Sequence, residues 1–480
     1  MTQTVRVDQL VDDQKVGWFN LDLLFWSFLA MLADGYDLGA LSYAQPELQA
    51  LWHLPKTAFG LASSASLVGI LLGAPLFGLL GDRIGRRRAI VAGSIVYGLF
   101  TLGTVWTQTL PQIEAMRFAT GLGLGGIMPN TIALNSELAP RRRRATLVTL
   151  MFIGVSVGSG LPGAVAYGLM PRYGWTVLFT IGGIGSLVLA AALALRLPES
   201  VKFLALHPRR RSELLRNLQR MRPEIEFSDD VCLIAEPDAT AAAAESSELR
   251  QIFRGDLGRI TALLWICFAS ALMALFFLNS FLPLIFSSTL GRQQVALLAT
   301  LFPIGGAMGG LLVSALVDRL GLIVVAALFA LAMPAIASLG VVRPDFLTYA
   351  PLVILAGLAV HGAQHGNNAA AGLLYPTGVR SKGVGLALGI GRTGAIVGPL
   401  IGARLLELPL RWIFFAAAVP VLVGTCAACL LMRLCYTRLG GCRLREMPVQ
   451  SDGAKLGMVR FDECASDLHF VGAREACTRK

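Results

Sequence analysis

Long apolar stretches separated by short polar connections recur along the whole chain. Each is roughly 20 residues long, the length that an α-helix needs to cross about 30 Å of hydrocarbon. Helices of a soluble protein would instead carry a polar face along their length. The pattern predicts an all-α membrane protein with twelve transmembrane helices, at residues 21–45, 57–80, 89–107, 110–136, 146–170, 174–196, 260–287, 295–317, 322–341, 348–372, 382–405 and 411–432.

The composition supports this interpretation. Hydrophobic residues make up 55% of the 480 and charged residues 15%, against about 25% charged residues in a soluble globular protein. Residues 1–20 are polar and the first apolar stretch is too long for a signal-peptide core, so no cleavable signal is expected. The cysteines are predicted to be membrane-embedded or cytoplasmic and reduced, which argues against disulfides. The tail residues Cys464, His469 and Cys477 fit no standard zinc spacing, so no metal site is expected.

The net charge of +11 is distributed as membrane topology requires. Arginines cluster in alternate connections, at 83 and 86–88, at 141–144, at 319 and at 380. By the positive-inside rule, both termini and residues 197–259 then lie in the cytoplasm. We expect a multi-pass protein of a plasma (bacterial inner) membrane, with the lipid bilayer and not nucleic acid as its large partner.

The chain repeats itself at an offset of 236 residues. The matched positions include Gly69 and Gly305, Gly73 and Gly309, Asp82 and Asp318, Arg83 and Arg319, Gly121 and Gly357, Arg144 and Arg380, and Gly158 and Gly394. Six helices repeated in one orientation predict two parallel six-helix bundles, with a substrate site between them at mid-depth. The repeated glycines would let helices approach closely.

The predicted organisation has five parts. They are a cytoplasmic N-terminal segment (1–20), a first bundle (21–196), a cytoplasmic linker (197–259), a second bundle (260–432) and a cytoplasmic tail (433–480). Within the linker, residues 212–221 are a candidate amphipathic helix.

Two carboxylates, Asp34 and Asp37, lie inside the first predicted helix. Ionisable side chains at that depth are costly and indicate function. Three residues apart, they are expected on one helix face, where desolvation and mutual repulsion favour proton uptake by at least one. A proton-coupled transporter is therefore the first hypothesis. Arg117 is a further intramembrane charge; it could snorkel to the interface or pair with Glu114, one turn earlier.

Polar side chains also interrupt two helices of the second half. His361, His365 and Asn368 share a face of the tenth predicted helix, which should look into a cavity. The alternative for the histidines is a hydrogen-bonded role between helices. Arg392 lies near the middle of the eleventh helix. Its guanidinium suits a carboxylate through two parallel hydrogen bonds, and the alternative is a buried ion pair with a protein acid.

Three motifs resemble those of the major facilitator superfamily: Gly78-x-x-Gly81-Asp82-Arg83-Ile84-Gly85-Arg86-Arg87-Arg88, Arg117-x-x-x-Gly121-x-Gly123-x-Gly125-Gly126 and Pro198-Glu199-Ser200. The resemblance covers nearly all of residues 20–432. It implies the superfamily's two-bundle fold, a role for Arg117 in proton coupling, and cytoplasmic contacts that break on opening. The expected gating residues are Asp82, Arg83, Arg86, Glu137, Arg144, Glu199, Asp318, Arg319 and Arg380. Their alternative is a topology signal alone.

Two further stretches, Tyr375-Pro376-Thr377-Gly378-Val379-Arg380 and Gly389-Ile390-Gly391-Arg392-Thr393-Gly394, resemble the aromatic acid:proton symporters of the superfamily, as does Asp34-Gly-Tyr-Asp37. This resemblance implies import of benzoate- or hydroxybenzoate-type carboxylates together with protons. Asp34, Asp37 and Arg117 would then serve proton coupling. The expected substrate-binding residues are Arg392, His361, His365, Asn368 and Tyr36.

Other functions stay open at this point. They are a proton-coupled carrier of another organic anion or a sugar, an efflux antiporter, and a sensor that binds aromatic acids without transport. The fifth helix lacks the Gly-Pro pattern of the superfamily's drug antiporters, which favours uptake. No G-x-x-x-x-G-K-[ST] loop occurs in the sequence, which argues against ATP as the energy source. We expect a monomer that is not an enzyme and needs no cofactor.

Overall fold

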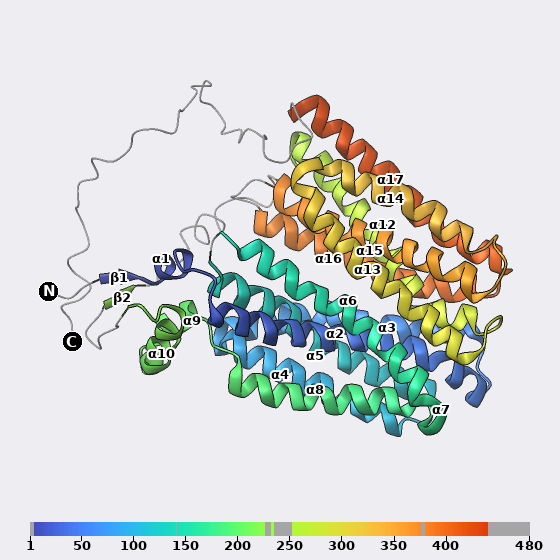
Figure 1. The fold of residues 1–480 in the computed structure, drawn as a ribbon, viewed down its shortest axis with the longest axis horizontal. Coiled ribbons are helices and arrows are strands. Elements are labelled where there is room, and N and C mark those ends of the chain that lie inside the picture. Colours follow the sequence, from blue (N-terminus) through green and yellow to red (C-terminus); the bar gives the residue numbers. More distant parts are fainter. Residues whose placement is uncertain (1–3, 141, 226–231, 235–251, 376–379, 440–480) are drawn as a thin grey trace. The chain divides into compact units, whose positions relative to one another are not determined.

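The computed structural model describes residues 4–140, 142–225, 232–234, 252–375 and 380–439, all within one compact unit. Helices dominate these residues (Figure 1). The twelve long ones in the described ranges are α2 (Trp18–Trp52), α3 (Phe59–Ile84), α4 (Arg86–Gly103), α5 (Leu110–Leu138), α6 (Arg144–Gly168), α8 (Thr176–Arg196), α12 (Gly255–Phe286), α13 (Arg292–Leu320), α14 (Leu322–Ser338), α15 (Phe346–Leu374), α16 (Arg380–Leu405) and α17 (Leu410–Leu439).

Each predicted span coincides with one of these helices, and the ends differ by a few residues. The largest differences are at α2, which begins at Trp18 and continues to Trp52, and at α17, which continues to Leu439. Of the helices in the described part of the chain, nine are long and apolar enough to cross a membrane. The other three are α2, α5 and the 17-residue α14. Crossing by all twelve helices therefore stays a prediction.

The two halves repeat the same helix packing. In the first half α3 packs on α5, α2 on α6 and α4 on α8; in the second half α13 packs on α15, α12 on α16 and α14 on α17. Between the halves α3 contacts α16, α6 contacts α13 and α2 contacts α12. The first half (α2 to α8) and the second half (α12 to α17) are thus two similar six-helix bundles. Figure 1 shows the two bundles side by side.

Glycines at the repeated positions make this packing possible. At each, an added Cβ would overlap a backbone carbonyl of the facing helix. The overlapping pairs are Gly69 with Phe118, Gly121 with Ser66, Gly305 with Ile354 and Gly357 with Phe302. The last two pairs lie 236 residues after the first two, so the internal repeat extends to individual backbone contacts between helices.

Short elements gather at the end of the first half where α2 begins, which we call the linker end. They are β1 (Thr4–Arg6), α1 (Val7–Asp12), α9 (Val201–Ala205), η3 (Pro208–Arg210), α10 (Arg211–Met221) and β2 (Cys232–Ile234). The opposite end, the far end, carries η1 (Lys56–Ala58), η2 (Thr104–Trp106) and α7 (Met170–Tyr173).

The amphipathic helix predicted in the linker is present as α10. Its Leu214 and Leu218 are buried in one apolar cluster with Leu10 and Leu204. The sequence did not predict that β1 pairs in parallel with β2, because strands of three residues show no alternation that could be recognised. The tail residues Cys464, His469 and Cys477 lie outside the described residues.

Candidate functional site

A cavity of about 270 Å³ lies between the two halves. Its walls come from α2, α3, α5 and α6 of the first half and from α12, α15 and α16 of the second. Most of the lining is apolar, as Leu67, Ile70, Phe152 and Phe276 illustrate. Such walls suit a small ring, and the few polar side chains among them would set its orientation.

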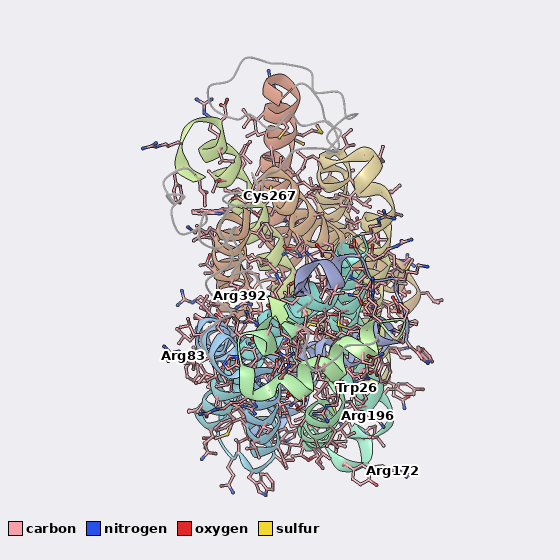
Figure 2. The ribbon with its side chains drawn as sticks, turned by 90° about the vertical axis from the view of Figure 1, so that its left-hand side faces the viewer. Trp26, Arg83, Arg172, Arg196, Cys267 and Arg392 are labelled. Atoms are coloured by element: carbon pink, nitrogen blue, oxygen red, sulfur yellow. The ribbon has the colours of Figure 1, made fainter. Side chains whose placement is uncertain are left out.

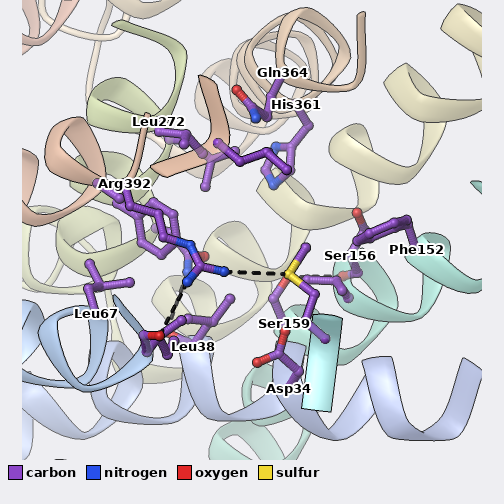
Figure 3. A pocket seen from close by; sticks show the side chains of 18 of the residues that line it. Asp34, Leu38, Leu67, Phe152, Ser156, Ser159, Leu272, His361, Gln364 and Arg392 are labelled. Atoms are coloured by element: carbon purple, nitrogen blue, oxygen red, sulfur yellow. Dashed lines mark hydrogen bonds between the residues drawn. The ribbon is translucent and has the colours of Figure 1, made fainter. Parts of the chain in front are cut away.

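Asp34 and Arg392 enter this cavity from opposite halves (Figure 3). The Arg392 guanidinium donates to the carbonyl of Ile70 at 3.2 Å and contacts the Met128 sulfur at 3.9 Å. No ion pair of Arg392 and no hydrogen bond or ion pair of the Asp34 carboxylate occurs among the described residues. The cavity therefore holds a carboxylate and a guanidinium that form no ion pair with each other.

Figure 2 places Arg392 where the two halves meet, whereas Arg83, Arg172 and Arg196 lie toward the outside. All three outer arginines are exposed. Exposed arginines fit topology and lipid contact. A guanidinium on the cavity wall instead fits an anion ligand.

Asp37 is in a different situation from Asp34. Its carboxylate accepts two hydrogen bonds of 2.6 Å from the Arg117 guanidinium, and the two side chains are 0% and 4% exposed. Asp37 does not belong to the cavity lining. Three residues advance a helix by about 300°, so the two acidic side chains diverge by about 60°, and only Asp34 faces the cavity.

The structure places two predicted residues differently from what their spacing suggested. For Arg117, the sequence left snorkelling or a pair with Glu114 open beside its expected role in proton coupling, and the structure pairs it with Asp37 on α2. Tyr36 was expected in the substrate site, but its hydroxyl donates to the carbonyl of Leu178 at 2.9 Å and its side chain is outside the cavity lining. Spacing within one helix cannot reveal which neighbouring helix a side chain faces.

Helix α15 contributes a polar stripe to the cavity, formed by His361, Gln364, His365 and Asn368. Their spacing of three and four residues places them on one helix face, as predicted. The Nδ1 of His361 lies 3.2 Å from the carbonyl of Gly357, and its ring packs against Phe302 with centroids 4.9 Å apart. The histidines, amides and Arg392 give the second-half wall its polar character.

Four of the six expected gating residues of the first half meet at the linker end, namely Asp82, Arg86, Glu137 and Glu199, whereas Arg83 is exposed. Arg86 pairs with Asp82 at 2.6 Å and lies 3.5 Å from Glu137. The Ser200 hydroxyl donates to Glu137, and the Arg87 backbone N–H donates to Glu199 at 3.1 Å. These contacts tie the loop between α3 and α4 to the end of α5 and to α9.

Glu199 is fully buried within this cluster. Burial raises the pKa of its carboxyl above the ordinary value, although hydrogen bonds from the Arg87 and Ser200 backbones and the charge of Arg210 act in the opposite direction. Arg144 pairs with Asp12 at 2.8 Å. The side chains of Asp318, Arg319 and Arg380 lie outside what the structure describes.

Two polar cavity residues were missed in the sequence, Ser156 and Ser159 on α6. The internal repeat contained a usable signal, because Ser156 lies 236 residues before Arg392. Ser156 on α6 and Arg392 on α16 both line the cavity, and α6 and α16 are equivalent helices of the two halves. Applying the repeat offset to Arg392 would therefore have identified Ser156.

Two repeated bundles with a partly polar cavity between them are the architecture of a membrane carrier. The family model of the Major Facilitator Superfamily matches residues 27–291 and 264–441. The chain therefore belongs to this superfamily; it is a multi-pass membrane transporter and not an enzyme.

Named relatives are similar over most of their length. The chain is 34% identical to the 4-hydroxybenzoate transporter PcaK of Pseudomonas putida, over 89% of this chain and 94% of that protein. It is 32% identical to a gallate transporter of Pseudomonas putida, over 85% and 90%. It is 31% identical to a benzoate transport protein of Acinetobacter baylyi, over 88% and 92%.

Solved structures agree on the fold. The xylose transporter XylE from E. coli matches with a TM-score of 0.65 at 18% identity, over 86% of this chain and 95% of that one. A bacterial homologue of the human lysosomal transporter Spinster also matches with a TM-score of 0.65, at 17% identity over 91% and 100%. The predicted all-α fold of two six-helix bundles is confirmed.

Proposed function

We propose that this protein is a secondary active transporter that imports small aromatic carboxylates by proton symport. The main observation in support of the proposal is that the cavity contains two charged side chains without an ion-pair partner in the described part of the chain. Asp34 and Arg392 lie in one cavity and neither has an ion-pair partner among the described residues. A protein that only needed these charges for stability would pair them, as it pairs Asp37 with Arg117.

The substrate carboxylate binds Arg392, and its ring lies against the apolar walls. Guanidinium binds a carboxylate through two parallel hydrogen bonds. Leu67, Phe152 and Phe276 provide the apolar surface for the ring. Three relatives that are 31–34% identical are named for transport of 4-hydroxybenzoate, gallate and benzoate, each an aromatic carboxylate, which supports this substrate class.

Asp34 carries the proton. While it is ionised, it attracts Arg392 and repels an incoming anion. Once protonated, it leaves the guanidinium free for the substrate, so proton and substrate binding are positively coupled. Asp37 and Arg117 balance each other next to this site and keep α2 and α5 together, so their part in coupling is to hold Asp34 in place.

Hydrogen bonds between the halves support alternating access. Tyr43 and Thr300 are hydrogen-bonded at 3.2 Å, and the Ser64 hydroxyl donates to the carbonyl of Ile396 at 2.8 Å. These side chains lie in the half of the helices toward the far end. On this proposal these bonds help to keep the far end closed and break when it opens.

The linker end faces the cytoplasm, and its charge cluster is the gate there. On this proposal the charge cluster moves as part of the first half, because its described contacts stay within that half. The proposed gating residues remain Asp82, Arg83, Arg86, Glu137, Arg144, Glu199, Asp318, Arg319 and Arg380. The linker connects the bundles, and the protein functions as a monomer.

Uptake into proteoliposomes tests the function. Purified protein should accumulate radiolabelled 4-hydroxybenzoate or benzoate when an inwardly directed proton gradient is imposed, with the outside acidic. A protonophore should abolish the accumulation. Binding without accumulation would indicate a sensor. Accumulation only in the direction opposite to the proton gradient would indicate an antiporter, and either result would overturn the proposal.

A further inference from the structure

Two amide acceptors line the cavity without a donor. The Oε1 of Gln364 and the Oδ1 of Asn368 are buried and accept no hydrogen bond from the described residues. Both side chains line the cavity. They are four residues apart on α15 and therefore occupy adjacent turns of one helix face. Because a buried polar atom without a partner is destabilising, a ligand that donates a hydrogen bond here binds better than one that does not.

The substrate carboxylate cannot supply this hydrogen bond. An ionised carboxylate is only an acceptor, whereas a phenolic hydroxyl both donates and accepts. The donor must therefore come from a substituent on the ring.

The cavity separates the two recognition points. Arg392 belongs to α16 and the amides belong to α15, and Figure 3 shows Arg392 and Gln364 entering the same cavity from these different helices. Apolar side chains such as Leu272 and Phe276 lie on the same wall. A ring held at Arg392 by its carboxylate therefore has a polar region elsewhere in the cavity for a second group.

We propose that Gln364 and Asn368 are specificity-determining residues that select aromatic carboxylates bearing a ring hydroxyl over those without one. The inference rests on the proposed function, because it places the carboxylate at Arg392. It goes further by assigning the opposite part of the substrate and its chemistry to two residues of α15.

The test compares hydroxyl with methyl at the same ring position. Uptake of labelled 4-hydroxybenzoate into proteoliposomes is competed with 3- and 4-hydroxybenzoate and with 3- and 4-methylbenzoate. The wild type should prefer one hydroxy isomer over its methyl analogue by about 10-fold or more. Gln364→Met and Asn368→Leu should each reduce that ratio by about 3-fold or more, with smaller effects on the methyl compounds.

Asn367→Leu is the matched control, because Asn367 is the same residue type on the same helix but lies outside the cavity lining. The preference of Asn367→Leu for the hydroxy over the methyl compound should equal that of the wild type. Since each ratio is measured on one preparation, loss of folded protein cancels. A wild-type ratio near 1, or ratios unchanged in both cavity variants, would overturn the inference. If no aromatic carboxylate accumulates in the wild type, the proposed function fails instead.

Discussion

The two halves of this protein share their backbone packing but not their charges. Close helix contacts at Gly69 and Gly121 recur at Gly305 and Gly357. By contrast, Arg117 corresponds to Val353 at the same offset. After Arg259, helix α12 has no charged residue to match the acids of α2.

The reverse is also true. Arg392 corresponds to Ser156, and His361 corresponds to Gly125. The first half thus supplies the acid of the cavity, and the second half supplies its guanidinium, imidazoles and amides. The comparison teaches that the repeated features build the fold, whereas the features that differ between the halves line the cavity of the proposed site.

The largest effect should come from breaking the ion pair that only the first half has. Arg117→Ala leaves the buried Asp37 carboxylate without its partner and should reduce the free energy of unfolding by about 3–5 kcal/mol. Thermal unfolding of the purified protein in detergent measures this loss. The control is Arg172→Ala, an exposed arginine at the far end, which should change stability by less than about 0.5 kcal/mol. Equal stability of the two variants would contradict the structural role of the pair.

Removing Arg392 should have the opposite effect, a loss of substrate affinity with little change in stability. Arg392→Gln removes no ion pair found among the described residues, so its stability should stay near that of the wild type. Its substrate affinity should fall by about 1.5–3 kcal/mol, roughly 10- to 150-fold, because a charged hydrogen-bond donor is lost. Calorimetric titration with 4-hydroxybenzoate checks this. Unchanged affinity would remove Arg392 from the site.

Substitutions at the repeated glycines should affect both halves alike. Gly121→Ala and Gly357→Ala each force a Cβ onto a facing carbonyl and should destabilise by about 1–3 kcal/mol. Gly372, on the same helix as Gly357, has open space around an added Cβ, so Gly372→Ala serves as the control and should not destabilise. If only one half responds, the packing repeat is not energetically equivalent.

The smallest effect should come from a single hydrogen bond between the halves, that of Tyr43 with Thr300. Tyr43→Phe removes about 0.5–1.5 kcal/mol from the closed far end and should raise its open population about 2- to 12-fold. Labelling of Ala296→Cys reports the opening, because Ala296 is only 4% exposed and lines a second pocket, at the far end, to which Tyr43 also belongs. Tyr36→Phe removes a comparable bond within one half and should leave the labelling rate unchanged. The same increase in both variants would count against a gate at Tyr43.

The sequence predicts the helices well because membrane insertion demands long apolar segments whatever the tertiary contacts. Asp34, Arg392 and the polar face of α15 were also found, since charges and amides inside such segments are few. The repeat predicted two bundles with a site between them. These features depend on local composition and spacing alone.

Contacts between helices were not predictable in this way. The partner of Arg117 lies 80 residues earlier in the chain, and the rotation of α2 that separates Asp34 from Asp37 depends on how α2 packs against α5 and α6. Tyr36 is expected in the substrate site from the resemblance of Asp34-Gly-Tyr-Asp37 to the aromatic acid:proton symporters, but its side chain points into the first half. Sequence spacing determines which side chains share a face of a helix, but not what that face contacts.

The central claim is that protonation of Asp34 and anion binding at Arg392 are coupled. The dissociation constant of 4-hydroxybenzoate, measured between pH 6 and 8 for the wild type and for Asp34→Asn, tests it most directly. The substrate is ionised throughout this range, since carboxyl groups ordinarily titrate near pH 4. We predict that wild-type affinity weakens as the pH rises, by up to about 10-fold per pH unit for one linked proton, and that Asp34→Asn shows no such dependence. The same pH dependence in both proteins would contradict the account.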